Sequence, residues 1–166
     1  MFPGAVTFVI PGKPFAKRRH RAAFNRHLGR VMTYDDAGNV SFERQVGTIA
    51  APLFPSPLTG PVLLSLVAVF EPAASLSKVK RAALLGTYHT QKPDRDNLLK
   101  SVKGGLNRIA WGDDCQVADG ICVKVWGEVA ETRVIIEPLP AVPPYPWRQI
   151  GSVIAPPSAS LIEAAE

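Results

Sequence analysis

The amino-acid sequence predicts a single α+β domain in which helices pack mainly on one face of a mixed β-sheet. The chain has 166 residues, a length that suits one domain and can bury a hydrophobic core without disulfides. Runs rich in β-branched and aromatic residues alternate with segments whose apolar residues recur at helical spacing. The expected order of elements is strand, strand, helix, strand, helix, helix, strand, strand, which is typical of an α+β domain.

The N-terminal part of the chain is expected to contain two strands joined by a basic loop. Residues 5–10 (AVTFVI) are rich in β-branched and aromatic residues, and a Pro-Gly turn follows them. Residues 30–34 (RVMTY) are predicted to be a short strand that returns from the loop. A helix is expected over residues 40–52, with an imperfect start at Ser41, because its apolar residues recur at spacings of four and three and prolines follow it.

The central and C-terminal elements are predicted from the same two kinds of pattern. Residues 62–70 (VLLSLVAVF) form a continuous apolar run, which is typical of a central strand. Amphipathic helices are predicted over residues 75–85, with a basic outer side, and over residues 97–109. Residues 117–126 and 132–136 are predicted to be two further strands joined as a hairpin.

Residues 1–137 are expected to form the folded domain, and the proline-rich residues 138–166 are expected to form an extended or disordered tail. No apolar run is long enough to cross a bilayer, and the N-terminus lacks a signal-peptide pattern, so a cytoplasmic protein without membrane association is expected. Cys115 and Cys122 fit neither a disulfide framework nor a CxxC metal site, and both are expected to be buried free thiols.

Positive charge is concentrated in one segment of the chain. The formal net charge is +5, and the segment from residue 13 to residue 30 holds seven Lys or Arg residues and no acidic residue. Such a segment favours a polyanionic partner, although a solvated loop has the same composition. Phe24 lies inside this segment and is a candidate to stack on an unpaired base, unless both it and Phe15 pack in the core. The candidate DNA contacts are Lys13, Lys17, Arg18, Arg19, Arg21, Phe24, Arg26, Lys78, Lys80 and Arg81.

The strongest chemical pattern lies in residues 93–116, which read PDRDNLLKSVKGGLNRIAWGDDCQ. Asp94 and Asp96 are two residues apart, and in extended geometry they would point the same way, just before a helix. The pair Asp113-Asp114 follows that helix, which could fold back and bring the two pairs together. Carboxylates placed in this way suit a hard divalent cation. Lys100, one helical turn after Asp96, could stabilise the charge of a phosphate, so the pattern suits metal-assisted phosphodiester hydrolysis.

The same residues also have a purely structural interpretation. Asp96 would be a good helix N-cap, and Asp94 would interact favourably with the helix dipole. The pair Asp113-Asp114 after a glycine is an ordinary turn composition, and Lys100 could be a solvated helix lysine. The spacing of these residues alone does not decide between the two interpretations.

The segment DRDNLLKSVKGGLNRIAWGDDCQV resembles the core motif of the RusA family of Holliday junction resolvases. That motif reads roughly D-x-D-N-x-x-K, then a helix ending in Leu-Asn, then Trp or Tyr and Asp-Asp-x-Gln-[IV]. The segments IPGKPFAKRRHR, RVMTY, ICVKVWGE and TRVIIE are similar to the family as well, so the resemblance covers most of residues 5–137. The residues that match the motif are Asp94, Asp96, Asn97, Lys100, Leu106, Asn107, Trp111, Asp113, Asp114, Gln116 and Val117.

The resemblance implies a homodimeric α+β nuclease that binds four-way DNA junctions and cuts two strands symmetrically in recombination and repair. It implies dependence on Mg²⁺, for which Mn²⁺ can substitute, and no small-molecule cofactor. The catalytic carboxylates would be Asp94, Asp96 and Asp114, the essential lysine would be Lys100, and Asp113 would assist in metal binding. A bacterial chromosome and an integrated phage are both plausible sources.

One position departs from the family pattern. Many members carry an aspartate midway along the helix, where this chain has Gly104 followed by Gly105. Paired glycines weaken a helix, and they indicate either a bend or a close backbone approach.

Several alternatives compete with the junction resolvase. A branched-DNA-binding protein with an impaired metal site and a flap or fork nuclease of the same fold both stay open. A restriction-type PD-(D/E)xK site is excluded because Cys122, not an acidic residue, stands two positions before Lys124. A small-molecule phosphohydrolase is not supported, because the sequence contains neither a glycine-rich phosphate loop nor an HExxH motif.

Overall fold

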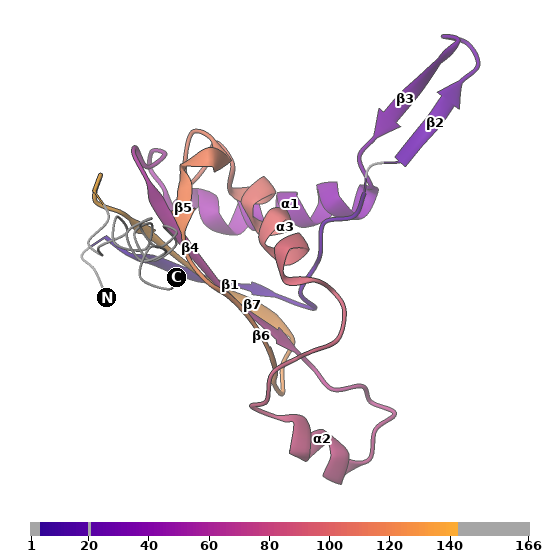
Figure 1. The fold of residues 1–166 in the computed structure, drawn as a ribbon, viewed down its shortest axis with the longest axis vertical. Coiled ribbons are helices and arrows are strands. Elements are labelled where there is room, and N and C mark those ends of the chain that lie inside the picture. Colours follow the sequence, from indigo (N-terminus) through magenta and orange to yellow (C-terminus); the bar gives the residue numbers. More distant parts are fainter. Residues whose placement is uncertain (1–3, 20, 143–166) are drawn as a thin grey trace, which may run out of the picture.

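The computed structural model of the chain describes residues 4–19 and 21–142. Within these residues, five strands form one mixed sheet, and two helices lie over one of its faces. A two-stranded ribbon and a short helix project from this body in different directions (Figure 1). The predicted α+β class and the mixed sheet are therefore confirmed.

The sheet is built around its longest strand, β4 (Val62–Phe70). One edge of β4 pairs with β7 (Glu131–Pro138) in antiparallel register, and β7 pairs in turn with β1 (Val6–Pro11). The other edge of β4 pairs in parallel with β5 (Val117–Asp119) and with β6 (Cys122–Trp126). The continuous apolar run thus forms the central strand, as predicted.

The predicted hairpin between the last two strands is wrong. Strand β4 lies between β6 and β7, so the two strands that follow each other in the sequence do not pair. The predicted strand over residues 117–126 is also divided in two at Gly120, which adopts a positive φ of 135°. A side chain there would collide with the carbonyl of Leu64, so the close approach of two backbones requires glycine.

The two helices that cover the sheet are α1 (Ala37–Ala50) and α3 (Arg95–Leu106), and both begin earlier than predicted. The side chain of Asp36, not Ser41, caps α1 and accepts a hydrogen bond from the Gly38 N–H at 2.9 Å. A short 3₁₀ helix, η1 (Ala51–Leu53), extends α1 into the following prolines.

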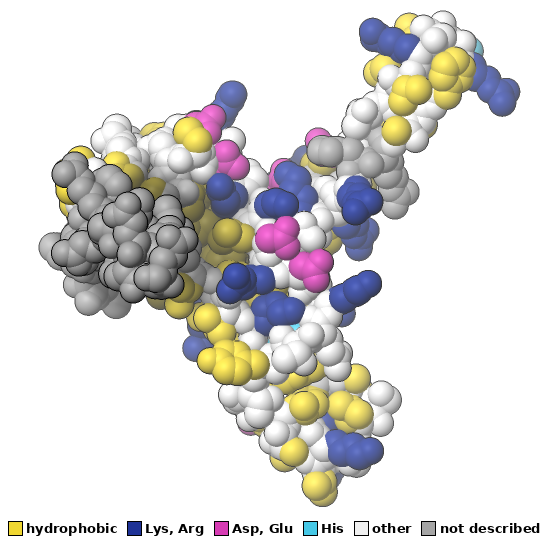
Figure 2. Space-filling model, in the orientation of Figure 1, with side chains coloured by type: hydrophobic (Ala, Val, Ile, Leu, Met, Phe, Trp, Pro, Cys, Tyr) yellow, Lys and Arg dark blue, Asp and Glu magenta, His cyan; other side chains and the backbone are white. Residues whose placement is uncertain are grey.

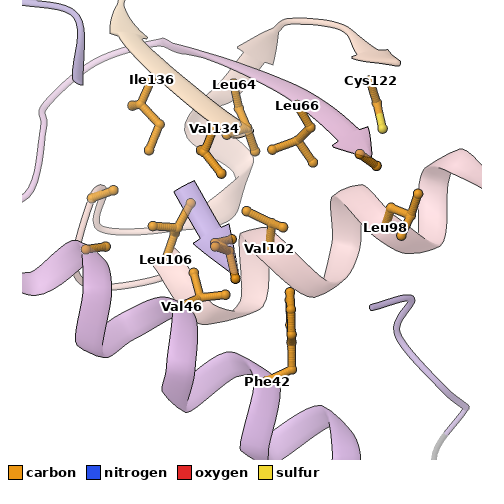
Figure 3. Close-up of a cluster of buried hydrophobic side chains, with 14 of the residues drawn as sticks. Phe42, Val46, Leu64, Leu66, Leu98, Val102, Leu106, Cys122, Val134 and Ile136 are labelled. Atoms are coloured by element: carbon orange, nitrogen blue, oxygen red, sulfur yellow. The ribbon is translucent and has the colours of Figure 1, made fainter. Parts of the chain in front are cut away.

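The hydrophobic core lies between these helices and the sheet. Phe42 and Val46 of α1 and Leu98, Val102 and Leu106 of α3 point toward the apolar face of β4 and β7 (Figure 3). All five side chains are buried, and removing their apolar surface from water stabilises the fold. The strand residues that complete the cluster include Leu64, Leu66, Val134 and Ile136.

Helices α1 and α3 touch through glycine. A Cβ atom added at Gly105 would lie 2.6 Å from the Val46 Cβ and 2.8 Å from the Glu43 carbonyl oxygen. On the facing helix, a Cβ at Gly47 would lie 3.4 Å from the Gly105 carbonyl oxygen. Of the two explanations considered for the paired glycines, close backbone approach accounts for Gly105.

The projecting parts are a ribbon of β2 (Arg21–Asn25) and β3 (Arg30–Tyr34) and the helix α2 (Lys78–Leu84). Strand β3 was predicted, but β2 was missed because the basic segment was expected to be a loop. Helix α2 is shorter than predicted and buries none of its residues, and Val79 is 80% exposed. Its expected apolar face is therefore not covered by the rest of the described chain.

Among the described residues, none of the helices has the length and apolar character needed to span a bilayer. Strand β7 includes Pro138, and the Leu139 N–H donates to the Pro61 carbonyl, while residues 143–166 of the expected tail lie outside the described residues. Both cysteines are free thiols; Cys122 is buried, but the expected burial of Cys115 is wrong because it is exposed.

Candidate functional site

The first aspartates of the candidate site lie at the start of α3. Asp94 is the N-cap residue with extended backbone (φ −71°, ψ 146°), but its side chain accepts no capping hydrogen bond from the helix. Asp96 lies in the first helical turn, so the expectation that both residues have extended geometry is wrong. Both side chains are exposed, which leaves the two carboxylates accessible to a ligand.

Lys100 lies one turn after Asp96 on the same side of α3, as the sequence predicted. Its Nζ is 3.1 Å from Asp96 Oδ2. This hydrogen bond from Lys100 holds the pKa of the Asp96 carboxyl below its ordinary value, so the carboxylate form is favoured.

The second acidic pair, Asp113 and Asp114, follows α3, and its two carboxylates have different contacts. Asp113 caps the 3₁₀ helix η2 (Asp114–Gln116): its carboxylate accepts the Cys115 N–H at 2.9 Å, which lowers the pKa of Asp113. The Gln116 side chain completes this capping box and also donates to the carbonyls of Leu58 and Gly60. Asp114 is exposed and lies 3.7 Å from Lys103 Nζ, so it faces α3 while Asp113 holds the turn.

Two charged residues near α3 were missed by the sequence analysis. Lys103 pairs with Asp114, and Glu43 of α1 pairs with Lys17 at 2.7 Å. Lys103 could have been found because it lies three residues after Lys100 and therefore on the same helix face. No sequence pattern points to Glu43, because it comes close to Lys17 and α3 only through the packing of α1 on α3.

The loop before Asp94 is fixed by contacts from the sheet. The ammonium of Lys124 on β6 donates to the Gln91 carbonyl at 2.6 Å and to the Pro93 carbonyl at 2.7 Å. The peptide bond between Lys92 and Pro93 is cis. These contacts tie the residue just before Asp94 to the edge of the sheet, so the first catalytic candidate is held by the rigid body.

His89 anchors the same loop at its beginning. Its ring is buried, lies 3.9 Å from the Phe70 ring centroid in a stacked arrangement, and lies 4.3 Å from the Trp126 ring centroid. Burial lowers the pKa of His89, and the positive charges of Lys124 and Lys13 lower it further. The native fold therefore favours the neutral imidazole.

A pH-dependent loss of stability follows from His89. Because its folded-state pKa is lower than its unfolded-state value, its contribution is fully present above about pH 6.5 and is lost as the pH falls below that value. Between pH 7.5 and 5.5, the melting temperature of the parent should fall more than that of His89→Phe. Each kcal/mol of stability that His89 loses on protonation should add about 2–4 °C to the fall of the parent. His20 and His27 remain in both proteins, so equal falls would contradict the assignment to His89.

The candidate metal ligands are Asp94, Asp96, Asp113 and Asp114. Their exposed carboxylate oxygens are the kind of ligand that a hard divalent cation prefers. In the part of the chain that the structure describes, however, no three Asp, Glu, His or Cys side chains lie close enough together to hold one ion. Asp96 and Asp114 are each paired with a lysine of α3 instead. The structure thus brings both acidic segments to α3 but does not bring their carboxylates to one point.

The predicted DNA-binding residues lie on the N-terminal basic segment, on the ribbon of β2 and β3, and on α2. Figure 2 shows acidic side chains in the middle of one face, with Lys and Arg side chains on either side and on both projecting parts. Lys17 reaches the candidate site, and its backbone N–H donates to the Asn97 carbonyl of α3. The exposed members of the predicted set are Lys13, Arg18, Arg19, Phe24, Arg26, Lys78 and Lys80, whereas the side chain of Arg21 lies outside the description.

Some of the predicted DNA contacts also have structural roles. Arg18 pairs with Asp36 at 3.2 Å, which links the basic loop to the start of α1. Arg81 pairs with Glu71 at 3.1 Å. The two phenylalanines of the basic segment separate clearly: Phe15 stacks on Phe42 beside the core, whereas Phe24 is 63% exposed on the ribbon. Of these two rings, Phe24 is therefore the more accessible to stack on a base.

Comparison with known proteins gives two findings. A family model described as "Endodeoxyribonuclease RusA" matches residues 11–137. A protein of Bacillus subtilis (strain 168), described as "Uncharacterized protein YqaN", is 32% identical over 142 residues, which are 82% of this chain and 98% of the relative. The family match includes the basic segment, both acidic pairs, β4, β5, β6 and all of β7 except its last residue, but only the last residue of β1.

Proposed function

Because the chain belongs to the RusA family of endodeoxyribonucleases, we propose that it resolves four-way DNA junctions by metal-assisted phosphodiester hydrolysis in recombination and repair. The observation that carries this proposal is the pair of acidic segments on α3 and η2, with Lys100 and Lys103 between them, on a face bordered by two basic projections. The proposed place of action is the bacterial cytoplasm, where chromosomal and phage DNA recombine.

The proposed roles at the site follow from the chemistry of each side chain. Asp94, Asp96 and Asp114 would hold Mg²⁺, or Mn²⁺ in its place, and Asp113 would act mainly by holding the turn that presents Asp114. A bound divalent cation would polarise a phosphoryl oxygen and lower the pKa of the attacking water. Lys100 would stabilise the negative charge that develops on the scissile phosphate. No small-molecule cofactor is part of this proposal.

The basic projections support a role in binding branched DNA. The ribbon of β2 and β3 and the helix α2 extend from opposite ends of the acidic face, and both carry exposed Lys or Arg (Figure 2). Contacts with phosphates position DNA without reading its sequence, which suits an enzyme that recognises a junction by shape. Phe24 at the ribbon is the residue we propose to stack on an unpaired base at the crossover.

A homodimer is part of the proposal, because a four-way junction has nearly twofold symmetry. Two identical sites related by a C2 axis would make two equivalent cuts. The mass of the chain in solution, measured by light scattering with and without junction DNA, tests this directly. A monomer in both states would contradict it.

The function is tested with a labelled synthetic four-way junction, incubated with Mg²⁺ or with EDTA beside a linear duplex of the same sequence. We expect paired nicks on the junction alone, and only with Mg²⁺. A flap and a fork as further substrates separate the junction resolvase from a flap or fork nuclease of the same fold. Binding to the junction without any cut would favour a branched-DNA-binding protein with an impaired metal site.

A further inference from the structure

A pocket lies beside the acidic residues of the candidate site. It has a volume of about 450 Å³ and lies between the N-terminal basic segment, α3 and η2. Its lining residues are Lys17, Lys100, Lys103, Gly104, Asn107 and Asp114. Three of the six are lysines and one is acidic, so the pocket has the composition of a site for an anion.

Each of the three lysines is held in place by a carboxylate. Lys17 pairs with Glu43 at 2.7 Å, Lys100 with Asp96 at 3.1 Å, and Lys103 with Asp114 at 3.7 Å. The side chains of Lys17 and Lys103 are only 30% and 21% exposed, whereas that of Lys100 is 61% exposed. Lys17 and Lys103 are therefore oriented before any ligand arrives, which lowers the entropy that they lose on binding it.

Gly104 makes room for this arrangement. A Cβ atom at this position would collide with Glu43 Oε1, and it would lie 2.9 Å from Glu43 Cδ and 3.3 Å from Lys17 Nζ. The space next to α3 that a side chain at position 104 would fill is thus taken by a carboxylate from α1 and by the ammonium that it holds. The absence of a side chain at Gly104 is what allows Glu43 to place Lys17 at the pocket.

We propose that this pocket binds one backbone phosphate of the DNA next to the phosphate that is cut, with Lys17 and Lys103 as donors and Glu43 as the residue that positions Lys17. Lysine binds phosphate as a compact point charge. Lys100 and Lys103 are three residues apart on one helix face, with about 5–6 Å between Cβ atoms, so the two ammonium groups can serve neighbouring phosphates. The inference rests on the proposed function, because it takes Lys100 to face the scissile phosphate.

Glu43→Gln gives the sharpest test, because a purely electrostatic role and a positioning role of Glu43 predict opposite changes in DNA affinity. If Glu43 acts only through its charge, removing a negative charge near DNA should strengthen binding. If it positions Lys17, its removal should weaken binding, and the weakening should disappear when Lys17 is already Gln. Glu131→Gln is the matched control, because Glu131 also pairs with a cation, Arg133 at 2.6 Å, but does not line the pocket.

The experiment measures the dissociation constant of the full chain for a four-way junction in EDTA over a range of salt concentrations. Lys17→Gln and Lys103→Gln should each weaken binding and lower the slope of log K against log salt by about 1. Lys103→Arg, which keeps the charge, should keep the slope. Unchanged slopes in both Gln variants, or tighter binding by Glu43→Gln, would overturn the proposal.

The phosphate that the pocket binds is located by replacing single phosphates of the cut strand, one at a time, with uncharged methylphosphonates and measuring the affinity for each junction. The parent should lose affinity at two neighbouring positions, one of which becomes insensitive in Lys100→Gln and the other in Lys103→Gln. A parent that binds the junction but shows no position dependent on Lys103 would overturn the pocket while leaving the proposed function standing. A parent that does not bind the junction at all would overturn both.

Discussion

Asp94→Asn is expected to lower cleavage of a four-way junction by about a thousandfold or more, while junction binding stays the same or becomes tighter. The several kcal/mol that a bound metal ion contributes to the transition state depend on its anionic ligands, and each 1.36 kcal/mol corresponds to a factor of ten in rate. The Asp94 side chain caps no backbone N–H of α3, so the amide should not weaken the helix. Loss of one negative charge that faces phosphate should favour binding.

Single-turnover cleavage with Mg²⁺ and the dissociation constant in EDTA measure the two effects separately. Asp119→Asn is the matched control, because Asp119 is also an exposed aspartate but lies on β5, where its carboxylate accepts the Gly120 N–H. Cleavage by Asp94→Asn at the parent rate would remove Asp94 from the site. Equal losses in both variants would show that the effect is not specific to Asp94.

Gly105→Ala is expected to destabilise the fold by about 1–3 kcal/mol, the range that overpacking of a core usually costs. The added methyl group would lie 2.6 Å from the Val46 Cβ and 2.8 Å from a backbone carbonyl of α1, and neither atom can move without separating the two helices. The intrinsic preference of a helix for alanine over glycine, about 1 kcal/mol, offsets only part of this cost. Urea unfolding measures the change.

The adjacent Gly104→Ala is the control, because it makes the same change on the same helix. Its methyl group would meet only the flexible ends of Glu43 and Lys17, which can move away. The gain in helix propensity should then balance the loss of a surface ion pair, which is worth about 0.2–1 kcal/mol. A Gly105→Ala protein as stable as Gly104→Ala would show that α1 and α3 do not pack as closely as their backbones indicate.

The sequence was most informative where the spacing of apolar residues along the chain matches the residues that become buried. The apolar run of β4 and the helical periodicity of α1 and α3 predicted buried elements, and these elements form the core. Helix starts were predicted less well, because the apolar periodicity begins a few residues after the caps: α1 begins after Asp36 and α3 after Asp94, earlier than the predicted residues 40 and 97. The final hairpin was wrong because the glycine between β6 and β7 suggested local pairing, whereas β4 inserts between the two strands.

The site shows the same division between local and distant information. The relation of Asp96 to Lys100 could be predicted because both residues lie on one helix, one turn apart. The partners of Lys17 and Asp114 could not be predicted, because each ion pair joins two segments that meet only in the folded chain. The separate roles of Asp113 and Asp114 also depend on a turn conformation that two adjacent aspartates do not specify.

The pairing of the first strand with the last constrains how the chain can fold. Among the described residues, strand β1 pairs with β7 alone, and β7 also covers one edge of β4, so the sheet stays incomplete until the residues near Pro138 are available. During synthesis, β4 therefore emerges with both hydrogen-bonding edges unpaired, because β5, β6 and β7 all follow it in the chain. Strand pairing over such long sequence separations slows folding, because the entropy of closing the loop is lost before the contacts form. A nascent chain of this topology depends on its C-terminal strand to bury the hydrogen-bonding edges that would otherwise promote aggregation.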